Sequence, residues 1–299
     1  MRFITFNHQK LSKLALGTVQ FGLDYGIANS DGKPSQESVN EIIDYVSSQQ
    51  LNCFDTAQVY GDSEEVLGSS LKHKRDVFLI SKFTSDAFKY DVSKNIENSL
   101  NNLNTQTLYA LLLHDCDLLY DWKQEYSVKI VSLISNKKIE YFGVSIYSSE
   151  DFEIALNNDS IKFIQIPFNL FDQRALSEDW FRKAKEKNKL LFIRSVFLQG
   201  LLLMKIENVP EKLEISKKYL RQLDSICKDL DMTRNELALS YVDSVAQDSL
   251  ILFGCDNLSQ AKQNIENYNS LKKLNAKIIS RINKIFKEID EKIYNPSKW

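Results

Sequence analysis

Glycine and proline are scarce in this chain. Its 299 residues include nine Gly and four Pro. Collagen-like chains, low-complexity chains and long flexible linkers need far more of these two residues, so the composition excludes all three. The scarcity also suggests that each glycine lies where a tight turn or a ligand needs a backbone without a side chain.

Cysteine is scarce as well. The four cysteines, Cys53, Cys116, Cys227 and Cys255, lie far apart in the sequence and form no Cys-x-x-Cys pair. A disulfide framework or a zinc site would need closer or more regular spacing. We therefore predict a protein of the reducing cytoplasm that holds no metal ion.

An excess of charge of one sign and long apolar runs are both missing. The chain carries 38 Lys and Arg against 40 Asp and Glu, a net charge of -2. This balance argues against electrostatic binding to nucleic acid or to an acidic membrane surface. No apolar run approaches the roughly 18 residues that a membrane span requires. The first residues turn polar too soon for a signal peptide. We expect no nucleic-acid partner, no membrane partner, and a monomer or a small homo-oligomer.

The chain alternates instead between short apolar runs and segments with helical spacing. The apolar runs are near-continuous, as expected for parallel strands that are covered on both faces. The predicted strands are Leu14–Leu16, Asn52–Phe54, Val77–Ser81, Tyr109–Leu113, Tyr141–Val144, Phe163–Ile166, Leu190–Ile193 and Leu250–Phe253. The predicted helices are Ser35–Ser48, Ser63–Leu71, Ser93–Leu103, Trp122–Ser135, Ser149–Leu156, Ser177–Lys187, Glu214–Asp229 and Thr233–Ala246.

This alternation predicts an α/β protein with a parallel sheet. Eight such units without a linker fit a closed (β/α)8 TIM barrel, which we predict as a single domain over residues 1–299. The rival architecture, an open doubly wound sheet, needs Gly-x-Gly-x-x-Gly after its first strand. Residues 17–22 read GTVQFG here and do not match.

Two segments lie outside the eight units. Alternating apolar positions in Met1–Lys13 predict an N-terminal β-hairpin that plugs the barrel floor. In Ser270–Ile293, Leu and Ile recur every three or four residues, which predicts one extra C-terminal amphipathic helix on the outside of the barrel. Tyr294 and Trp299, in the tail that follows, either fold over the barrel mouth as a lid or lie in a frayed end.

Polar side chains that suit proton transfer follow three consecutive strands. Asp55 and Tyr60 follow the second predicted strand, Lys82 the third and His114 the fourth. In a TIM barrel the C-terminal ends of the strands meet at the mouth, where active sites lie. An ammonium group lowers the pKa of a nearby Tyr, and a carboxylate keeps that ammonium charged and in place. With an imidazole to hold a carbonyl oxygen, the set could donate a proton to an oxygen that becomes negative.

Two of these residues, Asp55 and Tyr60, lie in a stretch that resembles the signature FDTAxxYGxxExxLG of the aldo-keto reductase superfamily. Residues 54–68 read FDTAQVYGDSEEVLG. The resemblance covers essentially the whole chain, and it implies a barrel that reduces aldehydes or ketones with a nicotinamide dinucleotide. It also implies Tyr60 as the general acid, Lys82 as the group that lowers the pKa of Tyr60, Asp55 as the partner of Lys82, and His114 as the residue that orients the carbonyl.

The resemblance also implies a set of cofactor-binding residues. Ser145 and Gln165 match positions that hold the nicotinamide carboxamide, whereas Ile146 replaces the Asn that is usual in the family. Arg194 replaces an aromatic residue that commonly stacks on the nicotinamide. Its planar guanidinium would either stack on that ring or hydrogen-bond an anionic substrate group. The complete set is Gly17, Thr18, Asp55, Ser145, Gln165, Arg194, Ser195, Phe197, Leu198, Gln199, Gly200, Gly254, Cys255, Gln260 and Asn264.

Residues 253–264 resemble the family segment that opens the helix holding the adenosine phosphate. Members that prefer NADP often have Lys or Arg there, to pair with the 2′-phosphate. The nearest basic residue in this chain is Lys262, and Asp256 would repel a phosphate. We expect NADP(H), as is usual in the family, with NAD(H) as the alternative.

Together these features predict an NAD(P)H-dependent oxidoreductase that reduces a small carbonyl compound to an alcohol. Residues 194–202 resemble a bacterial subgroup that is linked to surface-sugar biosynthesis, which implies a sugar or sugar-nucleotide substrate. Two alternatives stay open at this point. One is a dehydrogenase that oxidises a sugar or polyol, and the other is a regulatory protein that uses a bound cofactor as a redox sensor.

Overall fold

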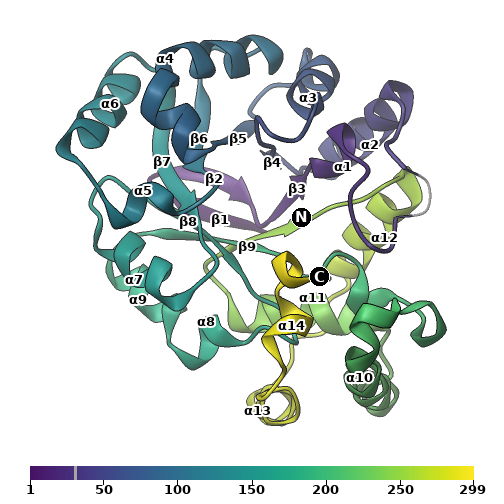
Figure 1. Ribbon diagram of the computed structural model, residues 1–299. Helices are drawn as coiled ribbons and strands as arrows, with labels where there is room; N and C mark the ends of the chain where they lie inside the picture. The colour runs from purple at the N-terminus through teal and green to yellow at the C-terminus, as the bar shows by residue number, and fades with distance from the viewer. Residues whose placement is uncertain (30–31) are drawn as a thin grey trace.

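The computed structural model describes residues 1–29 and 32–299. Eight parallel strands close into a barrel, because the last strand, β10, pairs with both β9 and β3. Helices surround this barrel (Figure 1). The predicted (β/α)8 barrel is therefore confirmed, and every predicted strand overlaps an observed one. The barrel strands are β3 (Leu14–Gly17), β4 (Cys53–Asp55), β5 (Phe78–Phe83), β6 (Leu108–Leu113), β7 (Ile139–Ser145), β8 (Phe163–Pro167), β9 (Leu190–Arg194) and β10 (Leu250–Phe253).

The outer helices follow the predicted pattern, with shifted ends. For example, α4 starts eight residues before the predicted Ser93, because the Thr84 side chain accepts a hydrogen bond from the Ala87 N–H and caps it there. None of the helices in the described part of the chain is long and apolar enough to cross a membrane. The helices up to the last strand are α1 (Val19–Gly22), α2 (Gln36–Ser48), α3 (Ser63–Leu71), α4 (Ser85–Asn102), α5 (Asp117–Tyr120), α6 (Gln124–Ser135), α7 (Ser149–Asn157), α8 (Arg174–Ser177), α9 (Trp180–Glu186), η1 (Leu201–Leu203), η2 (Ile206–Asn208), η3 (Glu211–Ser216), α10 (Lys217–Leu230) and α11 (Arg234–Val245).

Side chains inside the barrel form a hydrophobic cluster of their own, separate from the layer between strands and helices. Successive residues of a strand point to opposite faces, so every second residue points inward. The inward cluster contains Cys53, Ile80, Leu112, Phe163 and Phe192 from five different strands. The interior is thus filled by side chains and leaves no pore, as is usual for a TIM barrel.

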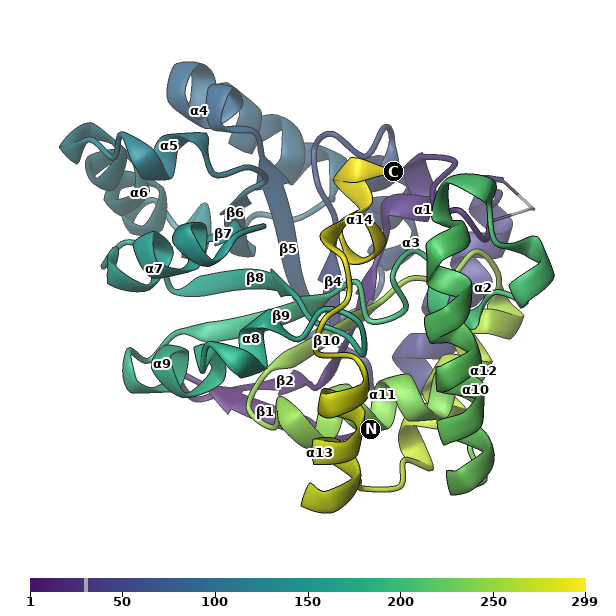
Figure 2. The same ribbon diagram turned by 60° about the horizontal axis from the view of Figure 1, so that its bottom comes forward.

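The N-terminal hairpin closes one end of the barrel, as predicted. Strands β1 (Phe3–Phe6) and β2 (Gln9–Ser12) pair antiparallel. The Phe6 ring packs edge-on against Phe163, with ring centroids 5.2 Å apart, and against Tyr141 at 5.5 Å. Figure 2 shows the hairpin lying across the barrel at the end opposite α1. The barrel interior is therefore open to solvent only from the other end.

The C-terminal segment differs in part from the prediction. The expected single helix over Ser270–Ile293 is two helices, α13 (Ala276–Ile285) and α14 (Glu291–Tyr294). They follow α12 (Leu258–Asn269), whose C-cap is Ser270. Asn275 and Asp290 cap the two later helices, because their side-chain oxygens accept hydrogen bonds from backbone N–H groups of the first turn. Inside a helix the same side chains compete with the backbone for hydrogen bonds, so Asn and Asp are favoured where a helix begins. The apolar spacing was therefore correct, but two capping residues interrupt the helix.

Candidate active site

The inward residues at the top of all eight strands form one ring at the mouth. On seven of the eight strands this residue lies two positions after a residue of the inward cluster, as Asp55 does after Cys53 and Lys82 after Ile80, and on β7 Ser145 follows Gly143 in the same way. Because strand periodicity is two, the polar residue keeps the inward direction of the core residue below it. The ring comprises Gly17, Asp55, Lys82, His114, Ser145, Gln165, Arg194 and Gly254. All eight were predicted as site residues.

Asp55 and Lys82 form a buried ion pair within this ring. The Lys82 Nζ lies 2.6 Å from Asp55 Oδ2 and also donates to the Thr56 carbonyl at 2.8 Å. Both side chains are almost fully buried. The other oxygen of Asp55 accepts a hydrogen bond from Gln165 Nε2 at 3.0 Å. Since a buried charge must be paired to be tolerated, each group fixes the position of the other.

Two glycines fix the loop that carries Tyr60. Gly61 has a positive φ of 58°, which a residue with a side chain rarely adopts. A Cβ atom on Gly22 would lie only 1.7 Å from the Tyr60 carbonyl oxygen. The loops after β3 and β4 can therefore approach this closely only with glycine at position 22.

The Tyr60 phenol stays protonated in this setting. Burial raises its pKa, and the negative charge of Asp55 raises it further, whereas Arg194 lowers it. Lys82 Nζ lies 5.1 Å from the centre of the Tyr60 ring, but its charge is already paired with Asp55. The lowering of the Tyr60 pKa by Lys82 stays a prediction, and with its pKa raised by burial Tyr60 is an O–H donor at neutral pH.

His114 lies beside Tyr60. Its backbone N–H donates to the Phe83 carbonyl at 2.7 Å, which continues the pairing of β5 with β6 by one residue. The two rings meet edge to face, with centroids 5.6 Å apart. Burial and the nearby Lys82 charge lower the pKa of His114 to about 4. The imidazole is therefore neutral at neutral pH and can donate one N–H to an oxygen.

The ring opens into a pocket of about 540 Å³, a size typical of ligand sites. Asp55, Tyr60 and His114 line it at its base, together with Ser145 and Gln165. The Ile146 side chain is fully buried, so the position where the family usually has Asn offers no polar group to the pocket.

The loop Ser195–Gly200 borders the pocket in an unusual conformation. Ser195, Leu198 and Gln199 have positive φ angles, as does Gly200. Such backbone is costly for residues with side chains and is concentrated at ligand sites. Asn169 anchors the loop by donating to the Ser195 carbonyl at 3.0 Å. Ser195, Phe197, Gln199 and Gly200 line the pocket, but the Leu198 side chain is buried in the core.

The start of α12 borders the far end of the pocket. Asn257 caps this helix by accepting from the Gln260 N–H at 3.0 Å. Gln260 and Asn264 line the pocket, as do Gly17, Thr18 and Gly254. Cys255 was also predicted to contact the cofactor, but its side chain is fully buried in the core. This helix end offers backbone N–H groups, which suit an anion.

Two buried polar atoms in the pocket-lining residues have no hydrogen-bond partner among the described residues. They are Gln20 Oε1 and Arg194 Nε. A Cβ atom on Gly254 would lie within 3.0 Å of the Gln20 amide, so glycine at position 254 leaves the backbone of the pocket wall uncovered. Unsatisfied polar atoms and a bare backbone fit an extended polar ligand such as a dinucleotide.

Several pocket residues escaped the sequence analysis. Tyr25, Tyr147, Gln20 and Asn235 all line the pocket. They lie in loops or on helices with no motif of their own, so their sequence context carried no signal. The tail lies outside the pocket lining as far as residues are described. It is folded, since Trp299 Nε1 donates to the Lys292 carbonyl at 2.9 Å and Arg174 stacks on the Tyr294 ring at 4.9 Å.

Comparisons with known proteins agree with this geometry. The chain is 28% identical to the aldo-keto reductase YhdN of Bacillus subtilis over 205 residues, which span 64% of this chain and 60% of YhdN. It is 22% identical to D-arabinose 1-dehydrogenase of Saccharomyces cerevisiae over 97% of this chain and 92% of that protein.

Solved structures share the fold. An aldo-keto reductase from Bacillus halodurans in its holo form superposes with a TM-score of 0.79 at 20% identity, covering 100% of this chain and 99% of that one. An aldo/keto reductase from Klebsiella pneumoniae in complex with NADP and acetate gives a TM-score of 0.71 at 20% identity, covering 95% of each chain. Residues 13–287 match the model of the aldo/keto reductase family. The chain thus belongs to the aldo/keto reductase family of oxidoreductases.

Proposed function

We propose that this protein reduces an aldehyde or ketone to an alcohol with a nicotinamide cofactor, and that its substrate is a sugar or sugar-nucleotide derivative. The observation that carries the first part is the convergence of Asp55, Tyr60 and His114 at the base of one pocket, with Lys82 buried against Asp55 beside them. The second part rests on the resemblance of residues 194–202 and on a relative named as a sugar dehydrogenase.

Each of the four residues has a distinct role in the proposed reaction. Tyr60 donates its proton to the carbonyl oxygen, which becomes negative as the carbonyl carbon is reduced. His114, neutral because burial lowers its pKa to about 4, donates an N–H to the same oxygen and orients the carbonyl. Lys82 stabilises the Tyr60 phenolate after the transfer, and Asp55 holds Lys82 charged.

The cofactor would supply a hydride to the carbonyl carbon when bound. Ser145 and Gln165 would hold its carboxamide, and the loop Ser195–Gly200 and the start of α12 would hold its phosphates. We propose NADP(H), because a relative of the same fold was solved with NADP. NAD(H) is the alternative, because Asp256 lies in the pocket lining and Lys262 Nζ packs over the Tyr45 ring at 5.7 Å.

The direction of the reaction in the cell has one serious alternative. The relatives include D-arabinose 1-dehydrogenase, a name that describes sugar oxidation. The same four residues would serve that direction, with the Tyr60 phenolate accepting the proton. We also propose that residues 1–299 act as one domain, and that the protein works in the cytoplasm, where its four free cysteines would stay reduced.

Substitution of Tyr60 by Phe tests the proposal. Loss of the phenolic proton should lower kcat for aldehyde reduction by about 1,000-fold, within the range expected for general acid catalysis. Turnover is measured with a panel of aldehydes and both NADPH and NADH. A Tyr60→Phe variant that keeps full activity would refute the mechanism.

Two further measurements complete this test. The dissociation constants of NADPH and NADH should be unchanged in Tyr60→Phe, because the phenol acts on the substrate. Tyr90 is 73% exposed on the outer helix α4, so Tyr90→Phe is a matched control that should retain wild-type turnover.

A further inference from the structure

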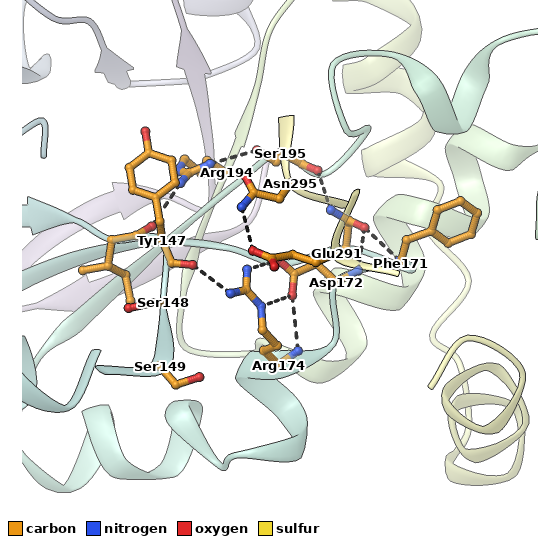
Figure 3. A network of polar contacts seen from close by, with 12 residues as sticks. Tyr147, Ser148, Ser149, Phe171, Asp172, Arg174, Arg194, Ser195, Glu291 and Asn295 are labelled. Carbon is orange, nitrogen blue, oxygen red and sulfur yellow. Dashed lines mark hydrogen bonds and ion pairs between the residues drawn. The ribbon is translucent and has the colours of Figure 1, made fainter. Parts of the chain in front are cut away.

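Arg194 is the one ring residue whose charge no described residue balances. Its Nη2 donates to the Ile146 carbonyl at 3.0 Å, and its Nη1 donates to Ser195 Oγ at 3.2 Å. The guanidinium lies over the Tyr147 ring, 4.4 Å from its centre (Figure 3). All three partners are neutral, and the buried Nε has none among the described residues.

A second arginine nearby shows what a paired guanidinium looks like in this fold. Arg174 makes two hydrogen bonds to Asp172, at 2.9 and 2.7 Å, and donates to the Tyr147 carbonyl at 2.7 Å (Figure 3). Tyr147 is therefore held by Arg174 through its backbone and by Arg194 through its ring. Within the described chain, no carboxylate lies within ion-pair distance of Arg194.

Two of the buried lysines of the described chain are paired with carboxylates, Lys13 with Asp243 at 3.0 Å and Lys82 with Asp55 at 2.6 Å. Lys189 has no carboxylate partner, but its ammonium donates to three backbone carbonyls. Arg194 differs from all three, because its buried Nε has no described partner and its side chain borders the pocket. A half-buried guanidinium with no counter-ion is costly unless a ligand supplies one.

Arg194 lies near the reacting end of the pocket. Its charge is among the causes that lower the pKa of both Tyr60 and His114. The ring around it contains one balanced ion pair, Asp55 with Lys82, and otherwise neutral groups. The base of the pocket therefore carries one net positive charge, located at Arg194.

We propose that Arg194 binds a carboxylate or phosphate group of the carbonyl substrate and selects anionic substrates over neutral ones. The inference rests on the proposed reductase function and names the class of compound that it acts on. A guanidinium fork that is stacked on an aromatic ring is preorganised for such a group, because its donors already point in a fixed direction. The stack on Tyr147 and the bonds to Ile146 and Ser195 supply that orientation.

Matched pairs of substrates test this selection. We compare 4-carboxybenzaldehyde with 4-nitrobenzaldehyde, which has nearly the same shape without the charge, and glyceraldehyde 3-phosphate with glyceraldehyde. Hydrogen bonds to charged groups are strong enough that the ratio of kcat/KM, charged over neutral, should fall about 10- to 100-fold in Arg194→Gln for at least one pair. The pair that responds identifies carboxylate or phosphate. Arg194→Lys should retain part of the ratio, because it keeps the charge but loses the fork.

Arg182→Gln is the matched control for the change in net charge. Arg182 is 59% exposed on α9, where it pairs with Asp179 and Glu186, and it lies outside the pocket. This variant should leave both ratios unchanged. A fall in the ratio that matches Arg194→Gln would mean that the overall charge of the protein, and not a contact, produces the selectivity.

Two results would overturn the inference while leaving the proposed function in place. One is the matching fall in Arg182→Gln. The other is an unchanged ratio in Arg194→Gln; if kcat/KM falls equally for charged and neutral substrates and NADPH binds more weakly, Arg194 is a cofactor residue. If the wild-type protein reduces no aldehyde at all, the proposed function fails instead. Binding of benzoate, measured by calorimetry, then still tests Arg194, since Arg194→Gln should weaken it about 10-fold or more.

Discussion

Two buried Lys–Asp pairs lie at opposite ends of the barrel and do different things. At the closed end, Lys13 lies 3.0 Å from Asp243, which also binds Arg2 at 2.8 Å. At the mouth, Lys82 lies 2.6 Å from Asp55. All four of these lysine and aspartate side chains are at most 9% exposed. Burial and pairing therefore do not distinguish the two sites.

The surroundings do distinguish them. The closed-end pair is surrounded by protein, with a second cation and the Tyr268 hydroxyl on Asp243 and the Gln247 carbonyl on Lys13. The mouth pair lies below Tyr60 and beside a pocket. A buried ion pair is weak evidence for stability or function by itself. The groups that contact an ion pair decide whether the pair serves stability or function.

Replacing the two lysines in the same way should give the largest contrast. Lys82→Met should lower kcat for carbonyl reduction by about 1,000-fold, because the Tyr60 phenolate loses the cation that stabilises it. Lys13→Met should leave kcat unchanged. Steady-state kinetics at a temperature where circular dichroism shows both variants folded would check this. Equal losses of activity in the two variants would mean that the closed-end pair also supports the reaction.

The closed-end pair should show its effect in stability. Asp243→Leu should lower the free energy of unfolding by about 3–5 kcal/mol, because it leaves Lys13 and Arg2 without their carboxylate. Lys13→Met should cost less, about 1–3 kcal/mol, because Asp243 keeps Arg2 as a partner. Urea denaturation measures both values. A larger loss in Lys13→Met than in Asp243→Leu would contradict this account of the pair.

The smallest effect is electrostatic and concerns His114. Burial and the Lys82 charge lower its pKa from 6.5 to about 4. Lys82→Met should therefore raise the pKa of His114, whereas Lys13→Met should not change it. The chain has only three histidines, so NMR titration can follow each imidazole separately. Unaltered titration of His114 in Lys82→Met would show that burial alone sets its pKa.

The same shift gives a pH dependence with a definite sign. Between pH 6.5 and pH 4 the unfolded chain binds a proton at His114 that the folded chain does not bind. The free energy of unfolding should therefore fall as the pH drops through this window. His114→Gln removes the group and should reduce that slope in urea denaturation. A slope equal to that of the wild type would show that other groups produce it.

Much of this arrangement was predictable from sequence, because two simple periodicities determine it. Near-continuous apolar runs placed all eight strands, and the position just beyond each run placed Asp55, Lys82 and His114 at the mouth. Because side chains alternate between the two faces of a strand, these three side chains point inward like the core residue two positions before each of them. The roles of the site residues remain a prediction.

Other features depend on contacts that sequence patterns do not report. Asn275 and Asp290 interrupt the predicted C-terminal helix, although its apolar spacing continues through them. Leu198 and Cys255 match the family's cofactor segments, but their side chains turn into the core. That no described residue gives Arg194 an acidic partner became visible only when the neighbouring strands and loops were placed around it.

The hairpin across the closed end limits how substrate enters the barrel and how product leaves it. Phe6 and Leu11 seal that end over an interior already filled by aromatic and aliphatic side chains. Substrate must therefore enter and product must leave through the same opening. A molecule that merely blocks this opening would halt exchange without contacting Tyr60 or its neighbours. An inhibitor could therefore act by obstructing this single entrance, and the pocket-lining residues Tyr147 and Leu203, 42% and 39% exposed, offer an apolar surface for doing so.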